Sequence, residues 1–160
     1  MTTEQQAYGR YDRGRAATPP SPPHLPNEYL GKGYFDERGN VFQELVTTAA
    51  EEVAKKLGTE GVTSTQLRRF YTKAKAVEQR MSAGENFESL IAGILELKQH
   101  AANAVGRAQG RDAEQGLKIL KSFIDRNVEL AVKGRDAFRK GFLLHFQGVV
   151  AYFKYHYPGK

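Results

Sequence analysis

The sequence predicts an all-α protein, a compact bundle of about five amphipathic helices that follows a disordered N-terminal tail. From Val41 onward, apolar residues recur at three- and four-residue steps, which is the period of a helix with one buried face. No segment after Val41 alternates apolar and polar residues with the period of two that is typical of a strand. Glycines stand between the periodic segments, where short joints are expected. We therefore expect one helical domain over residues 34–160.

The N-terminal segment has a different composition. Five of the six prolines lie between Pro19 and Pro26, and residues 8–15 are polar, glycine-rich and contain both tyrosine and arginine. A run of prolines lacks backbone donors and favours extended backbone, so no packed element is expected to begin there. We predict that residues 1–33 form a disordered tail. Its tyrosines and arginines are able to contact RNA weakly, although a solvated tail without a specific role is the simpler interpretation.

The first two predicted helices lie before residue 84. The apolar stripe of the first covers residues 41–57, and Gly58 and Gly61 follow it. The second begins at Thr63, which has capping-box spacing to Gln66, and its stripe continues to Met81.

The last three helices fill the rest of the chain. The third begins at about Asn86 and its stripe reaches Val105. The fourth begins at Asp112, with Gln115 three residues later, and its stripe ends at Ala131. The last runs from about Asp136 to Pro158 and is rich in phenylalanine. Each stripe is wide enough to bury one face of its helix in a shared core.

Composition excludes several classes of protein. The chain has 160 residues and no cysteine, which excludes disulfides, thiolate catalysis and cysteine-ligated zinc. No stretch of 18 or more apolar residues occurs, so we expect no membrane span. No apolar region follows Met1, so secretion is not expected and a cytoplasmic location is the prediction.

The sequence offers no catalytic or metal-binding constellation. The four histidines lack metal-ligand spacing, and His145, which lies between apolar neighbours, is interpreted as a packed structural residue. Gly31-Lys32-Gly33 lacks the rest of a phosphate-binding loop. The carboxylates of Glu51 and Glu52 lie on the polar side of their helix. We therefore predict no catalytic residue, no metal site, no cofactor and no enzymatic activity.

Basic residues give a stronger signal. The net charge is +6, and residues 63–82 carry five basic groups and one acidic group. Such a helix can place a ridge of cations against phosphates, which gives salt-dependent and sequence-independent binding. The alternative is that lysines and arginines face outward for solubility and pair with glutamates. The candidate RNA-binding residues are Arg68, Arg69, Lys73 and Arg80 on the second helix, Arg107 and Arg111 at the joint between the third and fourth helices, and Lys118 and Lys121 on the fourth helix.

Three segments carry a resemblance to a known family. Residues 62–71, Val-Thr-Ser-Thr-Gln-Leu-Arg-Arg-Phe-Tyr, resemble the signature of the small subunit of the Csm complex, the type III-A CRISPR effector. In that signature a Thr/Ser-rich helix start leads into a Gln-Leu/Ile-Arg-Lys/Arg-Phe core. Residues 104–107 and 142–154 are similar to the family's helix-three end and C-terminal helix. The three segments agree in order and spacing and cover roughly residues 40–157. Departures are Asn103 in place of a tyrosine, Gln147 in place of a glutamate, and the proline-rich tail.

The resemblance implies a non-catalytic subunit that serves antiviral defence in a prokaryotic cytoplasm. It would pack in several copies along the effector filament, beside the repeating backbone subunit and with the large subunit. There it would hold the guide RNA and its paired target. Base pairing would read sequence, while the protein reads backbone and shape. The resemblance carries this role over to Arg68, Arg69 and Arg107; the other five cations are added from charge and helical phase. Arg68 could instead be a buried, paired structural group. The alternative function is a self-associating helical scaffold that binds no nucleic acid.

Overall fold

The computed structural model describes residues 24–160, and within this range the protein is all-helical, as predicted. Residues 1–23 of the predicted disordered tail lie outside the described residues. The described residues form five α-helices and two short helical segments, in the order η1 (Gln43–Val46), α2 (Thr48–Thr59), α3 (Ser64–Ser82), α4 (Phe87–Gly106), α5 (Arg111–Ala131), η2 (Ala137–Leu143) and α6 (Leu144–His156). In the described part, strand-like pairing is limited to an isolated bridge between Phe35 and Val41.

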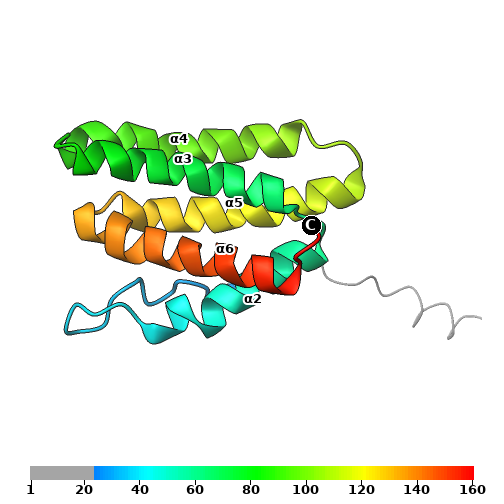
Figure 1. Ribbon diagram of the computed structural model, residues 1–160, viewed down its shortest axis with the longest axis horizontal. Helices are drawn as coiled ribbons and strands as arrows, with labels where there is room; N and C mark the ends of the chain where they lie inside the picture. The colour runs from blue at the N-terminus through cyan, green and yellow to red at the C-terminus, as the bar shows by residue number, and fades with distance from the viewer. Residues whose placement is uncertain (1–23) are drawn as a thin grey trace, which may run out of the picture.

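Helices α3 to α6 form an antiparallel bundle in which each helix reverses the direction of the one before it (Figure 1). Helix α4 packs against both α3 and α5, and α2 lies against α6 on the other side of the bundle. The core is aromatic: Phe146 of α6 makes edge-to-face contacts with Phe123 of α5 and Tyr71 of α3, at centroid distances of 5.1 and 5.2 Å. Such pairs add to the free energy gained by burying apolar area. Within residues 24–160, no helix is long and apolar enough to cross a membrane.

The predicted cap of the second helix is confirmed. The Gln66 backbone N–H donates to the Thr63 hydroxyl at 3.1 Å, and the Thr63 N–H donates to the Gln66 side-chain oxygen at 2.9 Å. Asn86 caps α4 through its side-chain oxygen, which accepts from the Ser89 N–H at 2.8 Å. These reciprocal bonds satisfy backbone donors that the first turn of a helix leaves without partners.

Two helix starts differ from the sequence-based expectation. Residues 41–46 do not join α2, because the backbone is extended at Phe42, where Phe42 N–H donates to the Tyr34 carbonyl, and η1 then forms a 3-10 turn. The fourth helix begins at Arg111 after Gly110, whose φ of 97° is readily adopted only by glycine, so Asp112 is a first-turn acid and not the cap.

Residues 24–33 pack against the bundle, which differs from the prediction that the tail extends to residue 33. Leu25 is 1% exposed, and the following Tyr34 is 3% exposed. This N-terminal segment is held by a chain of buried hydrogen bonds. Tyr34 OH donates to the Asn127 side-chain oxygen at 2.7 Å, and the Asn127 amide nitrogen donates to Tyr29 OH at 3.0 Å. The sequence did not predict this packing, because the hydrogen-bond partner of Tyr29, Asn127, lies 98 residues away in the sequence.

The predicted last helix is continuous but begins with a π-helical segment, η2, before α6. Gly141 in this segment lies directly against Tyr34, since a Cβ atom at Gly141 would stand only 2.2 Å from the Tyr34 ring. The missing side chain therefore makes room for the packed N-terminal segment. Helix α6 ends at His156, two residues before Pro158, as the sequence predicted.

Candidate nucleic-acid interface

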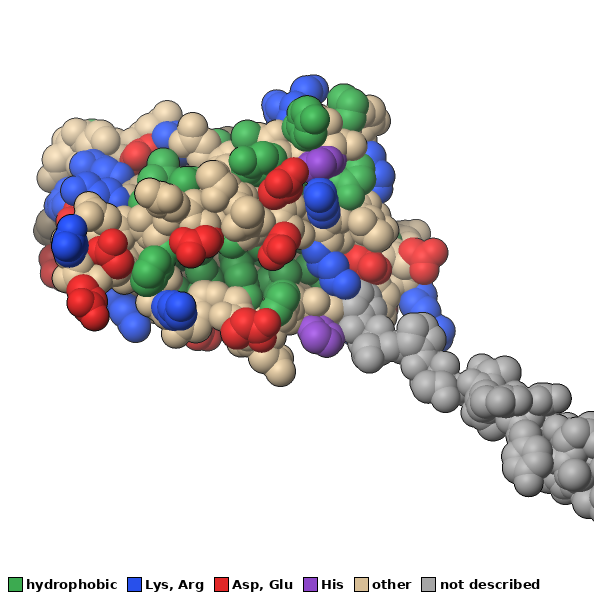
Figure 2. All heavy atoms as spheres, turned by 90° about the horizontal axis from the view of Figure 1, so that it is seen from below, with side chains coloured by type: hydrophobic (Ala, Val, Ile, Leu, Met, Phe, Trp, Pro, Cys, Tyr) green, Lys and Arg blue, Asp and Glu red, His purple; other side chains and the backbone are tan. Residues whose placement is uncertain are grey.

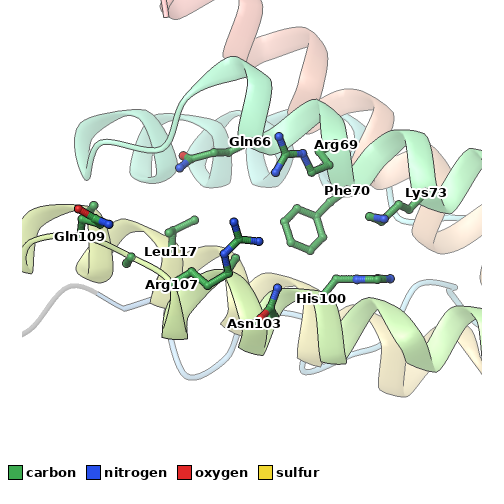
Figure 3. A pocket seen from close by; sticks show the side chains of 12 residues that line it. Gln66, Arg69, Phe70, Lys73, His100, Asn103, Arg107, Gln109 and Leu117 are labelled. Atoms are coloured by element: carbon green, nitrogen blue, oxygen red, sulfur yellow. The ribbon is translucent and has the colours of Figure 1, made fainter.

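An open groove with a volume of about 560 Å³ lies between α3, the C-terminal half of α4 and the first turns of α5 (Figure 3). Its lining contains three kinds of side chain. The basic ones are Arg69, Lys73, Arg107 and the histidine His100; the amides are Gln66, Asn103 and Gln109; the apolar ones are Phe70, Ala104, Ala108, Ala113 and Leu117.

The helical period places the cations at the edge of this groove. Phe70 is 4% exposed and points inward from α3, so Arg69 before it and Lys73 one turn later flank the buried position. Arg107 is the C-cap residue of α4, on the opposite wall. Figure 3 shows Arg69 and Arg107 extending from the two walls with the Phe70 ring between the helices. The groove thus collects positive charge from residues nearly forty positions apart.

Among the described residues, none that lines the groove carries a carboxylate. Across the described part of the chain, Arg69, Lys73 and Arg107 form no ion pair, since none has an acidic oxygen within 4.0 Å. The face seen in Figure 2 is different, because acidic and basic side chains are interspersed there. The arrangement can therefore attract an anion, because its charge is not neutralised from within the protein.

The family model described as Csm2 Type III-A matches residues 41–159 of this chain. The chain belongs to the Csm2 family. The match includes the three segments on which the resemblance was based, and it confirms the prediction of a small subunit of the type III-A CRISPR Csm complex. Comparisons with curated proteins and with solved structures found no match.

In this Csm2-family subunit, three of the eight predicted RNA-binding residues line the groove, and the other five lie outside its lining. Arg69, Lys73 and Arg107 come together in the groove. Arg68 is exposed on α3 and does not line the groove, so it is not the buried, paired group that was considered. Arg111 is exposed at the first position of α5, beside the groove and outside its lining.

The other three predicted residues of the Csm2-family chain have acidic partners. Arg80 donates to Glu85 through two hydrogen bonds of 3.0 and 2.5 Å. Hydrogen bonds from Arg80 and then Ser89 lower the pKa of Glu85, which keeps this carboxylate charged. Each lysine pairs one turn away along α5, Lys118 with Glu114 at 3.1 Å and Lys121 with Asp125 at 2.6 Å. These three cations have less free charge to offer an external anion.

The groove continues along the seam between α3 and α4. Lys73 and His100 also line an adjoining depression of about 210 Å³, which Arg80, Gly93 and Glu96 border. The part of the groove that carries only basic charge is therefore the end near Arg107. At the other end, the side chain of Glu96 contributes a negative charge.

Four polar residues of the groove were missed in the sequence: Gln66, His100, Asn103 and Gln109. One signal was available, since His100, Asn103 and Arg107 follow at steps of three and four and so share one face of α4. The sequence did not indicate which helix packs beside this face of α4, and the structure shows that it is α3.

Two histidines of the Csm2-family chain, the buried His145 and the half-buried His156, bond to other parts of the protein, which fits a structural role. His145 is completely buried and bonds to the Leu45 carbonyl and the Tyr29 hydroxyl, each at 2.6 Å. His156 pairs with Glu51 at 2.7 Å. Among residues 24–160, no group of three or more acidic or histidine side chains could hold a metal ion.

Proposed function

We propose that this type III-A small subunit binds the guide RNA and its paired target along the phosphate backbone through the cationic groove, without performing chemistry itself. The observation that carries the proposal is the convergence of Arg69, Lys73 and Arg107, none of which forms an ion pair with another residue in the range 24–160. Cations of this kind release counterions when they neutralise phosphates, so affinity falls as salt rises. Arg68 and Arg111 are exposed and lie within two positions of groove residues in the sequence, so they would extend the contact with RNA beyond the groove.

The proposal includes packing along the effector filament, with further copies of this chain, the repeating backbone subunit and the large subunit as partners. Cleavage of the target and signalling would then belong to other subunits. A cytoplasmic location accords with this role, because guide RNA is present there. A reconstitution tests the assembly: the tagged chain is co-expressed with the other Csm proteins and a CRISPR array. Recovery of a stoichiometric complex that contains guide RNA supports the proposal, and elution of the chain alone contradicts it.

A charge-reversal experiment tests the groove. The double variant Arg69→Glu with Lys73→Glu is expected to abolish RNA binding while retaining the helical circular dichroism spectrum. For the wild type, three contacts to single-stranded RNA predict a slope of log affinity against log salt of about −2. The matched control is Lys118→Glu with Lys121→Glu, which changes the net charge by the same amount at residues that already have acidic partners.

The control variant distinguishes the effect of charge in the groove from the effect of the total charge of the protein. Retained binding in the α5 control, with loss in the groove variant, supports the groove as the interface. Equal loss in both variants would mean that total charge, and not this groove, controls binding. Association that persists at high salt without RNA would favour the alternative, a self-associating scaffold held by apolar contacts.

A further inference from the structure

The groove has features that binding to a phosphate backbone alone does not require. It has an apolar floor and a set of side-chain amides in addition to its cations. We infer that it binds one unpaired nucleotide of an RNA strand, with the base inside the groove and the phosphate between the arginines. This inference rests on the proposed function and specifies what part of the RNA the site accepts.

The floor suits the flat, apolar face of a base. Phe70 and Leu117 are 4% and 6% exposed and close the bottom of the groove. Three alanines line it, which keeps the floor low where longer side chains would fill the space. The volume of about 560 Å³ lies within the range of about 300–1,000 Å³ that is usual for sites of small organic ligands. A ridge of surface lysines would have no such hollow.

The amides suit the edge of a base. Asn103 and Gln109 are exposed, and neither side chain has a hydrogen-bond partner among the described residues. The oxygen of Gln66 accepts from Thr63 in the helix cap, which leaves the amide nitrogen as a donor. An amide offers both donor and acceptor atoms, which match the mixed donors and acceptors on base edges.

The charges identify the ligand as an anion. Arg69 and Arg107 come from opposite walls, and the part of the chain that the structure describes contributes no carboxylate to the lining that would favour a cationic ligand. Guanidinium groups bind phosphate through paired hydrogen bonds and can also stack on bases. An apolar floor, amide edges and flanking guanidinium groups together match the three parts of a nucleotide.

The base must be unpaired to enter. In a duplex the edges of a base are used in pairing and its faces are stacked, so only the backbone is available to the groove. An unpaired base can contribute its own contacts, and stacking on an aromatic side chain such as Phe70 is worth about fivefold or more in affinity per base. The full-length chain is therefore expected to bind a single strand more tightly than a blunt duplex at equal salt.

Two groove variants of the full-length chain test this inference. Ala104→Leu fills the floor, with Ala102→Leu, an exposed position on the same helix outside the groove, as its control. Asn103→Leu removes an amide without changing charge, with the exposed Gln99→Leu one turn earlier as its control. Binding is measured by fluorescence anisotropy with a labelled oligouridylate of about 12 nucleotides, a length within the usual range of single-strand sites, and with a blunt RNA duplex. Circular dichroism melting verifies that each variant is folded.

The expected result is a loss of about fivefold or more in single-strand affinity for both groove variants, no change for their controls, and unchanged duplex affinity throughout. Wild-type single-strand binding in both groove variants, with binding still abolished by Arg69→Glu and Lys73→Glu, would overturn the nucleotide site and leave the proposed phosphate contact standing. Absence of any RNA binding by the wild type would overturn both.

Discussion

Acidification is expected to destabilise this protein through His145. The imidazole is fully buried, with Nδ1 2.6 Å from the Leu45 carbonyl oxygen and Nε2 2.6 Å from the Tyr29 hydroxyl. A carbonyl only accepts, so Nδ1 carries the proton and Nε2 accepts from Tyr29. Protonation would give the ring a second N–H, at Nε2, where the Tyr29 hydroxyl now donates, and would place a charge in an apolar core that includes Phe123. The folded state therefore favours the neutral ring.

The magnitude follows from the pKa. Burial lowers the pKa of His145 from 6.5 to about 4, against a smaller opposing effect of the hydrogen bond to Leu45. Between these two values the unfolded chain binds more protons than the folded chain, so the free energy of unfolding falls as pH falls. One pKa unit corresponds to about 1.4 kcal/mol, which gives a loss of about 3 kcal/mol from this group between pH 6.5 and pH 4. Below pH 4 the group contributes no further loss.

Urea unfolding at a series of pH values between 7 and 4 measures this effect. In His145→Gln the amide can donate to Leu45 and accept from Tyr29, so the variant should fold, but it cannot be protonated in this window. Carboxylates titrate in both proteins, and the difference between the two curves isolates the histidine. We expect the variant's stability to decline by about 3 kcal/mol less than that of the wild type. The exposed His100→Gln should follow the wild type. Parallel curves for wild type and His145→Gln would refute the reasoning.

Two further predictions concern packing. Leu25→Ala should lower the free energy of unfolding in urea by about 2–5 kcal/mol, because Leu25 is 1% exposed. The same change at Leu95, which is 43% exposed, should cost much less. Equal costs would mean that the N-terminal segment is not part of the core. Gly116→Ala should cost about 1–3 kcal/mol, because its Cβ would stand 2.4 Å from the Glu60 carbonyl oxygen. Gly106→Ala, with nothing within 4 Å of the added atom, is the control, and its thermal midpoint should stay level or rise.

The pairing of charges was partly visible in the sequence. Lys118 and Lys121 each have an acid one turn away on the same helix, and such local pairs are a known feature of exposed helix faces. The prediction of RNA-binding residues gave these cations the same weight as Arg69, although spacing alone indicated partners for them. Arg80 is different, because Glu85 lies beyond the end of α3 and reaches it only through the turn into α4.

The sequence by itself determined the helices, the cap at Thr63, the inward face of α3 and the family. These features depend on residues three or four positions apart, and that spacing is fixed by the geometry of a helix. Tertiary structure alone decided that Leu25 is buried and that Arg69 and Arg107 share a groove. Both outcomes depend on which helix faces meet, and the packing of several similar apolar stripes chooses among those arrangements through contacts between distant residues.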